Sequence, residues 1–452
     1  MSKEKNELPS SSAGKMEKIV SLCKRRGFVF PGSEIYGGLA NSWDFGPLGV
    51  ELKNNIKNVW WKRFVQQRDD MVGIDASLIM NTKVWENSGH LKEFSDPLVE
   101  CDKCKRRFRA DHIDSDYEKN KKFNKNIKCP DCKGNLSEPR QFNLMLKTFI
   151  GPAEEKANVA YFRPETAQAM FVDFKNVLNT TRRKLPFGIA QIGKAFRNEV
   201  TPGNFIFRTR EFEQMEIEYF IPKPMEDNEW QSVFNYWQKE MWSWCTENLG
   251  LKKENLGECE CEAQNRAHYS KKTIDIEYNY PFGKSELYGL AYRTDFDLKN
   301  HFPDSPYEDA EAKEKFYPHV IEPTFGVDRS VLAVLLDAYT EEKDRVVLKI
   351  KPSLAPYKIA VFPLLRNKPE LVKKAKEIFD VLKMNYMCEF DDNGNIGKRY
   401  RRQDEIGTPY CVTVDFDSLN DKAVTVRDRD TMKQERIAIS ELAKYFEEKL
   451  KN

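Results

Sequence analysis

The sequence predicts an α+β protein: an antiparallel-sheet domain that carries a zinc-ribbon-like insert is followed by a separate α/β domain. Three observations indicate this. Residues 188–219 contain two strand-like runs around a Pro-Gly turn, and residues 101–132 contain two Cys-x-x-Cys pairs. After residue 354, short apolar strands alternate with amphipathic helices. With 452 residues, of which 40% are hydrophobic, the chain can bury a large core divided among two or three domains.

The composition argues against a membrane or secreted protein. Lys and Arg number 73 and Asp and Glu 71, so the formal charge is only +2 and any nucleic-acid partner must be held by local basic patches. No apolar run approaches a membrane span, and residues 1–15 lack the apolar segment of a signal peptide. We therefore expect a cytoplasmic protein with no membrane partner. In that reducing compartment, the ten cysteines point to metal binding before disulfides.

The chain begins with a polar, Ser-rich stretch, residues 1–14, which we expect to be a flexible tail. The first domain then covers residues 15–352, with inserts at 98–140 and at about 224–272, and the second covers 355–452. A short helix is expected at 16–26. After glycine-rich turns, a long helix starts at Pro47 and carries an apolar stripe that comprises Leu48, Leu52, Ile56, Val59, Trp60 and Phe64. This stripe must pack on the sheet or on another subunit, and the residues alone favour the sheet.

The insert contains Cys101, Cys104, Cys129 and Cys132. Two Cys-x-x-Cys turns suit one tetrahedral zinc ion, because each tight turn presents two thiolates. The lysine- and asparagine-rich spacer between the pairs is typical of a surface loop, so a structural zinc is favoured over a catalytic one. Free thiols in a ribbon without metal remain the alternative.

The most densely charged stretch is RNEVTPGNFIFRTREFEQMEIE, residues 197–218. The alternation before and after it predicts two antiparallel strands joined by a long loop, with the charged side chains on one face. Burying such a face is unfavourable unless a ligand supplies groups that pair with the charges. Arginines match phosphates and carboxylates accept from amines, so the expected ligand has both groups. A solvated hairpin with cross-strand ion pairs is the alternative.

The other elements of the first domain follow from similar patterns. Pro164 is expected to start a helix with Glu165 in its first turn, and residues 228–249 form a core helix. Residues 278–292 alternate as one strand with Glu286 pointing inward. Residues 322–339 are expected to turn at Pro323 and Gly326 and then to form a buried helix that begins near Arg329.

The second domain is predicted from alternating strands and helices. Strands are expected at 358–362, 386–390, 410–414 and 423–427, and helices at 369–383, 396–406 and after Ser440. This alternation favours a largely parallel sheet. Its most basic segment, residues 398–402 (KRYRR), suits phosphates and a stacking aromatic, with a solvated helix face as the alternative.

Four motifs together carry a resemblance to a known family: FRPETAQ, FRNE followed by FRTREFEQME, EPTFGVDR, and GKRYRRQDEIGTPY. The chain resembles the class II aminoacyl-tRNA synthetases, and specifically the dimeric glycyl-tRNA synthetases, from about Gly32 to its C-terminus. The resemblance implies a glycine–tRNA ligase that forms glycyl-adenylate from glycine and ATP and then charges tRNA(Gly). Neither step needs a protein nucleophile, because positioning and charge stabilisation suffice.

The resemblance also assigns roles to residues. Arg197, Glu199 and Arg329 would be catalytic, and Glu286 would bind Mg²⁺. The implied ATP site comprises Arg197, Asn198, Glu199, Phe207, Arg208, Thr209, Arg210, Glu211, Phe212, Glu286, Leu287, Gly326, Asp328 and Arg329. The implied glycine site comprises Arg109, Glu165, Phe212, Glu213, Gln214, Glu216, Glu322, Thr324 and Gly326. By the same resemblance the helix at Pro47 would form a homodimer interface, which replaces the sheet-packing preference, and the second domain would bind the anticodon.

One departure concerns Thr324, where the family often has serine or alanine. The added methyl group is expected to narrow the pocket, and it could stand where the β-carbon of alanine would go. Two other functions remain open: a synthetase of this fold for another amino acid, and a non-catalytic, nucleic-acid-binding dimer derived from a synthetase. The second would have no reason to retain Arg197, Glu199, Glu286 and Arg329 together, and all four are present.

Overall fold

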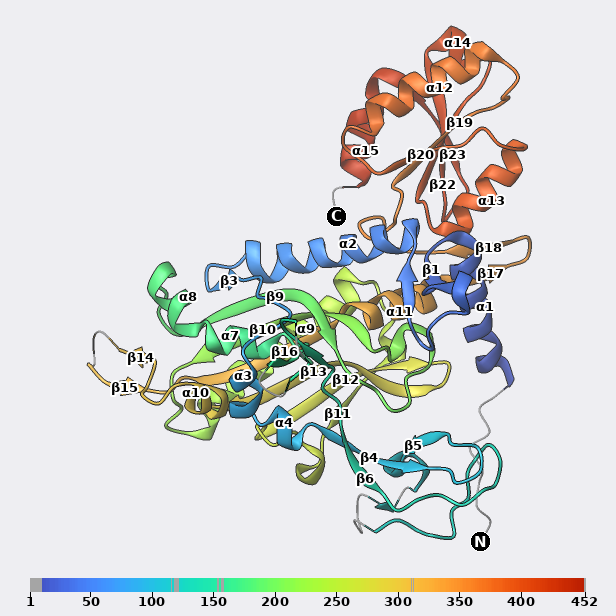
Figure 1. Ribbon diagram of the computed structural model, residues 1–452. Helices are drawn as coiled ribbons and strands as arrows, with labels where there is room; N and C mark the ends of the chain where they lie inside the picture. The colour runs from blue at the N-terminus through green and yellow to red at the C-terminus, as the bar shows by residue number, and fades with distance from the viewer. Residues whose placement is uncertain are drawn as a thin grey trace.

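The computed structural model describes residues 10–114, 116–117, 122–152, 154–155, 158–309, 311 and 313–450. A large sheet with helices on both faces forms the body of the molecule, a small insert lies on one side of it, and an α/β domain follows on the other side (Figure 1). None of the helices in these ranges is long and apolar enough to cross a membrane.

The body is built on a seven-stranded sheet in the order β11-β12-β13-β16-β10-β9-β3. Every pairing is antiparallel except that of β3 with β9. The strands are β3 (Met71–Gly73), β9 (Phe187–Phe196), β10 (Glu211–Ile221), β11 (Leu256–Glu260), β12 (Lys272–Tyr280), β13 (Gly283–Thr294) and β16 (His319–Gly326). The expected antiparallel pair around the Pro-Gly loop is therefore confirmed as β9 and β10, with Glu211 opposite Phe196.

Helices cover both faces of this sheet. Met215, Ile217 and Tyr219 of β10 share a core with α2 (Pro47–Trp61), α9 (Asp227–Ser243) and α11 (Val327–Ala338). On the other face, Phe220 packs with α7 (Ala167–Val172) and α8 (Phe174–Thr181). Further elements of the body are α1 (Ser10–Arg26), α3 (Thr82–Asn87), α4 (His90–Glu93), α10 (Phe296–His301), β1 (Val29–Pro31), β2 (Trp43–Phe45), β7 (Lys147–Phe149), β8 (Val159–Tyr161), β14 (Tyr307–Glu308), β15 (Lys315–Phe316), β17 (Tyr339–Glu342) and β18 (Arg345–Leu348).

The apolar stripe of α2 packs on the sheet of its own chain. Trp60 lies 5.8 Å from the ring of Phe325 on β16, and Phe64, in the π-helical turn Lys62–Gln66 that continues α2, lies 5.3 Å from it. The stripe thus packs as the residues alone favoured, while the dimer interface that the resemblance implies for this helix stays a prediction. The core helix expected at 228–249 is also present, as α9 and a π-helical turn Trp244–Asn248.

Four boundaries differ from expectation. Helix α1 begins at Ser10, inside the predicted tail, whose residues 1–9 lie outside the described ranges. Glu165 precedes α7, because this helix begins at Ala167 and not at Pro164. The single strand expected over 278–292 is instead a hairpin of β12 and β13, because Pro281 and Phe282 turn the chain. Pro323 lies within β16 and not in a turn.

The insert is a three-stranded sheet in the order β5-β4-β6. Its elements are β4 (Ser95–Glu100), β5 (Arg107–Arg109), α5 (Ala110–Ile113) and β6 (Arg140–Asn143). Figure 1 shows it beyond the edge of the main sheet, far from the C-terminal domain.

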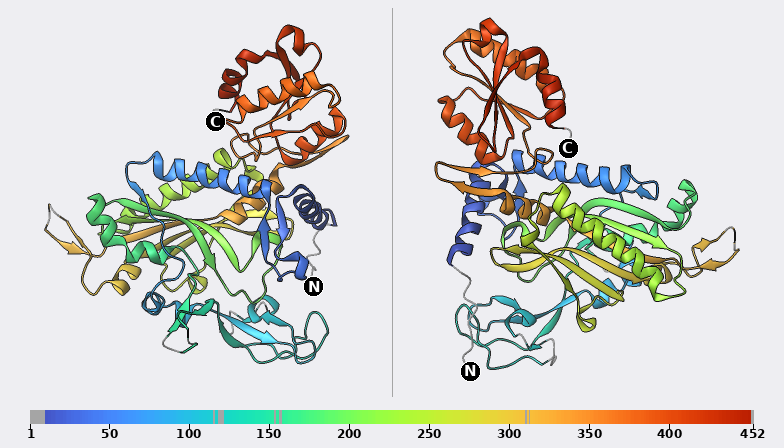
Figure 2. Two further views of the ribbon diagram at one scale, coloured as in Figure 1. Left: turned by 45° about the horizontal axis from the view of Figure 1, so that its top comes forward. Right: turned by 180° about the vertical axis from the view of Figure 1, so that it is seen from behind.

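The C-terminal domain contains a five-stranded sheet in the order β20-β19-β21-β22-β23. The elements are β19 (Ile359–Pro363), α12 (Pro369–Leu382), β20 (Cys388–Phe390), α13 (Ile396–Ile406), β21 (Tyr410–Val414), α14 (Ser418–Asp421), β22 (Ala423–Asp428), β23 (Gln434–Ala438) and α15 (Leu442–Lys449). Only the first three strands of the order are mutually parallel, while β22 and β23 pair antiparallel. The largely parallel sheet expected from the sequence was therefore wrong for this edge, because no helix long enough for a crossover separates β22 from its neighbours. Both views of Figure 2 show this domain resting on the end of the body where β17 and β18 lie.

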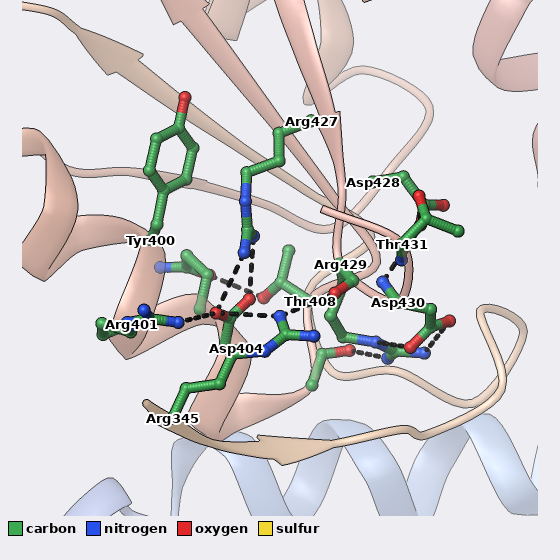
Figure 3. A network of polar contacts seen from close by, with 12 residues as sticks. Arg345, Tyr400, Arg401, Asp404, Thr408, Arg427, Asp428, Arg429, Asp430 and Thr431 are labelled. Atoms are coloured by element: carbon green, nitrogen blue, oxygen red, sulfur yellow. Dashed lines mark hydrogen bonds and ion pairs between the residues drawn. The ribbon is translucent and has the colours of Figure 1, made fainter. Parts of the chain in front are cut away.

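A buried ionic network joins the two domains (Figure 3). Asp404 of α13 receives Arg427 in a bidentate pair at 2.8 and 3.1 Å, and Arg345 from β18 at 3.1 Å. Arg345 also donates to the carbonyl oxygen of Arg429 at 2.8 Å. Because Asp404 is fully buried, these contacts fix the C-terminal domain against the hairpin that follows α11.

Candidate active site

A cavity of about 280 Å³ opens beside β10, β13 and β16. It brings together most of the residues that the sequence pointed to. Those that line it are Glu165, Arg197, Glu199, Phe207, Arg208, Thr209, Phe212, Glu213, Gln214, Glu216, Glu286, Leu287, Glu322, Thr324, Gly326, Asp328 and Arg329. Arg109, Asn198, Arg210 and Glu211 are not among the lining residues.

The pleat of β10 decides which of its side chains reach this cavity. Phe212, Gln214 and Glu216 line it, while Met215 and Ile217 point to the core on the other face. Glu213 is also among the lining residues, but its carboxylate forms ion pairs with Lys53 at 2.9 Å and with Lys57 at 3.0 Å, both on α2. The expectation that the charges share one face was therefore wrong, because odd and even residues of a strand diverge.

One end of the cavity is cationic and aromatic. The guanidinium of Arg197 lies 5.4 Å from the ring centre of Phe212, and its Nε donates to the carbonyl oxygen of Pro164 at 3.0 Å. Arg208 follows the short helix Phe205–Phe207 and lines the same region. Glu199 Oε2 is buried and, within the described ranges, has no hydrogen-bond partner. A buried acceptor without a partner in this cavity suits a ligand with an amino group.

Arg329 and Glu286 form an ion pair that lines the same cavity. Arg329 lies in the first turn of α11, and its Nη1 is 3.0 Å from Glu286 Oε2 on β13. The guanidinium also stacks over Phe207 at 4.6 Å. The cation of Arg329, more than any other group, lowers the pKa of the Glu286 carboxyl, so this carboxylate is ionised beside the cavity.

The other end is acidic. Thr324 Oγ1 lies 2.9 Å from Glu216 Oε1 and 3.2 Å from Glu322 Oε1, and the hydroxyl of Thr166 donates to Glu216 Oε2. Glu165 is held by Gln168 Nε2 at 3.1 Å and by His90 Nε2 at 3.4 Å. These carboxylates are almost completely buried.

Burial and crowding set the protonation of this acidic end. Burial raises the pKa of Glu322 to about 8, although the adjacent Arg293 opposes the rise. Burial and then the charge of Glu165 raise the pKa of Glu216. Burial also disfavours the ionised form of Glu165, yet His90 and Arg293 outweigh it and lower its pKa. The pocket is therefore poised to ionise fully when a cation enters.

The sequence patterns missed several residues of this pocket. Arg293 is buried, forms a bidentate pair with Asp297 at 2.8 Å and bonds Glu322. Tyr269 lines the cavity, and its ring centre lies 3.6 Å from the Arg293 guanidinium. The available signal was an Arg and an Asp four residues apart after a buried strand, which is also common in ordinary ion pairs.

Four predicted residues lie outside the cavity and have other partners. Arg109 forms ion pairs with Asp96 at 2.8 Å and with Asp111 at 2.6 Å. Arg210 donates to Ala40 O, Glu211 pairs with Lys194, and the backbone N–H of Asn198 donates to Leu144 O. The contacts of Arg210, Glu211 and Asn198 hold the loop between β9 and β10, whereas those of Arg109 lie within the insert.

The four cysteines of the insert meet in one cluster, with their sulfur atoms within 4.8 Å of one another. Cys101 and Cys132 lie 3.4 Å apart, and Cys104 and Cys129 lie 3.7 Å apart. The two turns are built alike: Lys105 N donates to Cys101 O and Lys133 N to Cys129 O, and both lysines have positive φ. Two matching turns around four sulfurs have the donor set and geometry of a structural zinc site.

Comparisons with known proteins agree with this site. Residues 149–339 match the tRNA synthetase class II core domain (G, H, P, S and T), and residues 358–449 match the anticodon binding domain. The fold is similar to a crystal structure of prolyl-tRNA synthetase from Cryptosporidium parvum, with a TM-score of 0.65 and 15% identity over 99% of this chain and 79% of that one.

Curated relatives are far more similar in sequence. The glycine–tRNA ligases of Caldanaerobacter subterraneus subsp. tengcongensis and Streptomyces coelicolor are each 54% identical, over 96% and 97% of this chain and 98% and 99% of their own. That of Alkaliphilus oremlandii is 55% identical over 96% of this chain and 98% of its own. The class II core, the anticodon-binding domain and this degree of identity over the whole length show that the chain belongs to the glycyl-tRNA synthetase family.

Proposed function

We propose that this protein is a glycine–tRNA ligase. It joins glycine to ATP, releasing pyrophosphate and forming glycyl-adenylate, and then transfers the glycyl group to a terminal ribose hydroxyl of tRNA(Gly). The observation that carries this proposal is that one cavity has an arginine-lined end and an end with three buried glutamates. A triphosphate and a small ammonium compound would meet between them.

The arginine-lined end would bind ATP. Arg197 would hold the α-phosphate, where charge develops as the glycine carboxylate attacks, and Arg208 and Arg329 would hold the outer phosphates. Phe212 offers a ring for adenine, and the partnerless Glu199 Oε2 offers an acceptor for its amino group. In this proposal Arg197, Glu199 and Arg329 have the catalytic roles that the resemblance implies.

Mg²⁺ would be held at this same end. Glu286 supplies an ionised carboxylate beside Arg329, and Asp275 lines the cavity close to Glu286. Carboxylate oxygens are the ligands that Mg²⁺ prefers, so the donor set fits. When bound, the ion would neutralise charge on the phosphates, while the arginines orient them.

The acidic end would bind glycine. Glu165, Glu216 and Glu322 surround a space suited to an ammonium group, which every amino acid carries. Selection of glycine must therefore be steric, with Thr324 and its neighbours filling the space beside the α-carbon. Arg109 would reach the carboxylate of glycine only if it broke its ion pairs with Asp96 and Asp111. We therefore propose that its present contacts stabilise the insert.

The cysteine cluster would hold a structural zinc ion. Its four sulfurs leave no open coordination position, which excludes a catalytic role for such an ion. Each of the two matching turns would supply two of the four thiolates to this ion.

The C-terminal domain would bind the anticodon region of tRNA(Gly). Within the basic segment, Arg399 is buried against the carbonyl oxygens of Asp392 and Gly394, and Tyr400 bonds Thr413. Lys398 is exposed, whereas Arg401 is half-buried and lies 3.6 Å from Asp404; both line a surface hollow with Arg26 of α1. Lys398 and the exposed part of Arg401 would contact phosphates, while Arg399 stabilises the fold.

A homodimer is also part of this proposal. Ile35 and Tyr36 are 87% and 86% exposed, and Leu39 is 66% exposed, in the loop that joins β1 to β2 ahead of α2. Apolar side chains gathered at such exposure suit a protein interface. A second copy of the chain would cover them, with the Pro47 helix at the edge of the contact. As a translation enzyme, the dimer would act in the cytoplasm.

Aminoacylation tests the proposal. Purified protein with ATP, Mg²⁺, glycine and a tRNA(Gly) transcript should accumulate acid-precipitable glycyl-tRNA, and a tRNA for another amino acid should stay uncharged. A folded protein that binds tRNA(Gly) but forms no glycyl-tRNA would instead favour the non-catalytic dimer.

A further inference from the structure

Glu218 lies deeper in the acidic end than the residues assigned to glycine. It follows Glu216 on the same face of β10, and the register of β10 with β16 places it opposite Glu322. Its side chain is fully buried, and oxygens of Glu216, Glu218 and Glu322 lie within 4.8 Å of one another.

The carboxyl group of Glu218 has no bonding partner. Neither Oε1 nor Oε2 forms a hydrogen bond with any of the described residues. Arg293, the nearest guanidinium, is already bonded to Glu322 and Asp297. A carboxylate anion without a partner at this depth would bear the full cost of lost hydration, so the neutral acid is the stable form.

The surrounding groups favour the same protonation state. The charged and titratable groups that face Glu218 are Glu216 on β10, Glu322 on β16, Arg293 on β13 and Asp297 on α10. Burial, followed by the charge of Glu322, raises the pKa of Glu218 well above its ordinary value. Acids this close titrate as a group, and the one with fewest hydrogen bonds keeps its proton longest.

The contacts of Thr324 indicate that a carboxyl group at this end carries a proton. Its hydroxyl lies within bonding distance of both Glu216 and Glu322 but has one proton to donate. One of these two contacts therefore requires a protonated carboxyl group when glycine is absent. Once the ammonium group of glycine draws Glu322 into its ionised form, that proton is gone, and Glu322 gains the capacity to accept a further hydrogen bond beside the one that Arg293 already donates to its Oε2.

We propose that Glu218 is a neutral carboxylic acid that acts as a positioning residue, donating a hydrogen bond to Glu322 when glycine binds. The inference rests on the proposed glycine site. The oxygens need only close from within 4.8 Å to hydrogen-bonding distance, which a side-chain rotation can achieve. The donation would hold the ionised Glu322 in place, so that its other oxygen keeps facing the ammonium group.

Two substitutions separate a donor from a charge. Glu218→Gln keeps a neutral donor of the same shape, so kcat/KM for glycine should stay within about threefold of wild type. Glu218→Met has no donor, so the KM for glycine should rise about tenfold or more while the KM for ATP stays unchanged. Equal losses in both variants would mean that a negative charge is required, and a fully active Glu218→Met would mean that Glu218 positions nothing; either result overturns the proposal.

A spectroscopic measurement tests the protonation state without any activity. The infrared difference spectrum of wild type minus Glu218→Gln at neutral pH should contain the carbonyl band of a protonated acid. Carboxylate bands alone would overturn the proposal. If wild type forms no glycyl-adenylate but shows the acid band, the proposed function fails while the protonation of Glu218 stands, so the two failures are distinguishable.

Discussion

Replacing Thr324 by valine tests whether its hydroxyl organises the glycine pocket. Valine keeps the branched shape and removes the oxygen, so the contacts of 2.9 Å to Glu216 and 3.2 Å to Glu322 are lost. A hydrogen bond to a charged group contributes about 1.5–3 kcal/mol, which corresponds to a loss of about 10- to 150-fold in kcat/KM for glycine. The KM for ATP should not change, because Thr324 lies at the other end of the cavity.

The assay is glycine-dependent exchange of pyrophosphate into ATP, measured over a range of glycine concentrations. Thr324→Ser is the matched control: it keeps the hydroxyl, so glycine activation should stay within about threefold of wild type. Serine also lacks the methyl group, so a rise in alanine activation relative to glycine in this variant would place that methyl in the wall. Wild-type glycine kinetics in Thr324→Val would refute the role of the hydroxyl.

Four further predictions follow from other parts of the structure. Arg197→Ala should lower adenylate formation about a hundredfold or more with little loss of stability, and near-normal exchange in the folded variant would contradict its phosphate role. The KM for glycine should fall as pH rises toward the pKa of Glu322, which is about 8, by at most about tenfold per pH unit. The reason is that the ammonium group of glycine lowers the pKa of Glu322, so binding releases a proton. A KM for glycine that does not depend on pH would contradict this. Elemental analysis should find one zinc ion per chain in the freshly purified protein, and metal-free protein would count against the site. The variant Cys129→Ser should lose both the zinc ion and the protease resistance of the insert. Asp404→Ala should lower the free energy of unfolding by about 3–5 kcal/mol in urea, because it leaves Arg427 buried without its anion and leaves Arg345 with Glu342 alone. The surface control Asp380→Ala should change the free energy of unfolding by about 0.5 kcal/mol or less.

Local patterns predicted much of the fold because they report burial directly. The apolar stripe from Leu48 to Phe64 and the core helix from Trp230 to Leu249 occur where their spacing placed them. The predictions failed where one residue type occurs in two kinds of local structure. Pro323 suggested a turn, yet it lies within β16, where the β10–β16 ladder skips it and tolerates its missing N–H.

The candidate site was predictable only in part. The dense charges of residues 197–218 drew attention to Arg197 and Glu216, and the resemblance implied Arg329; the structure gathers all three in one cavity. Spacing along the chain could not show that Glu213 points to Lys53 on the opposite face, since this depends on the pleat and on the position of α2. Nor could it identify Arg293, whose importance comes from contact with residues outside its own strand.

Amino-acid-dependent pyrophosphate exchange, with all twenty amino acids tested separately on the purified protein, examines the proposed activity most directly. If the cavity joins an ATP site to a pocket for the smallest amino acid, glycine alone should support rapid exchange, and alanine should be much slower. Exchange with another amino acid but not with glycine, or no exchange with any of them by a folded protein, would contradict the proposed function.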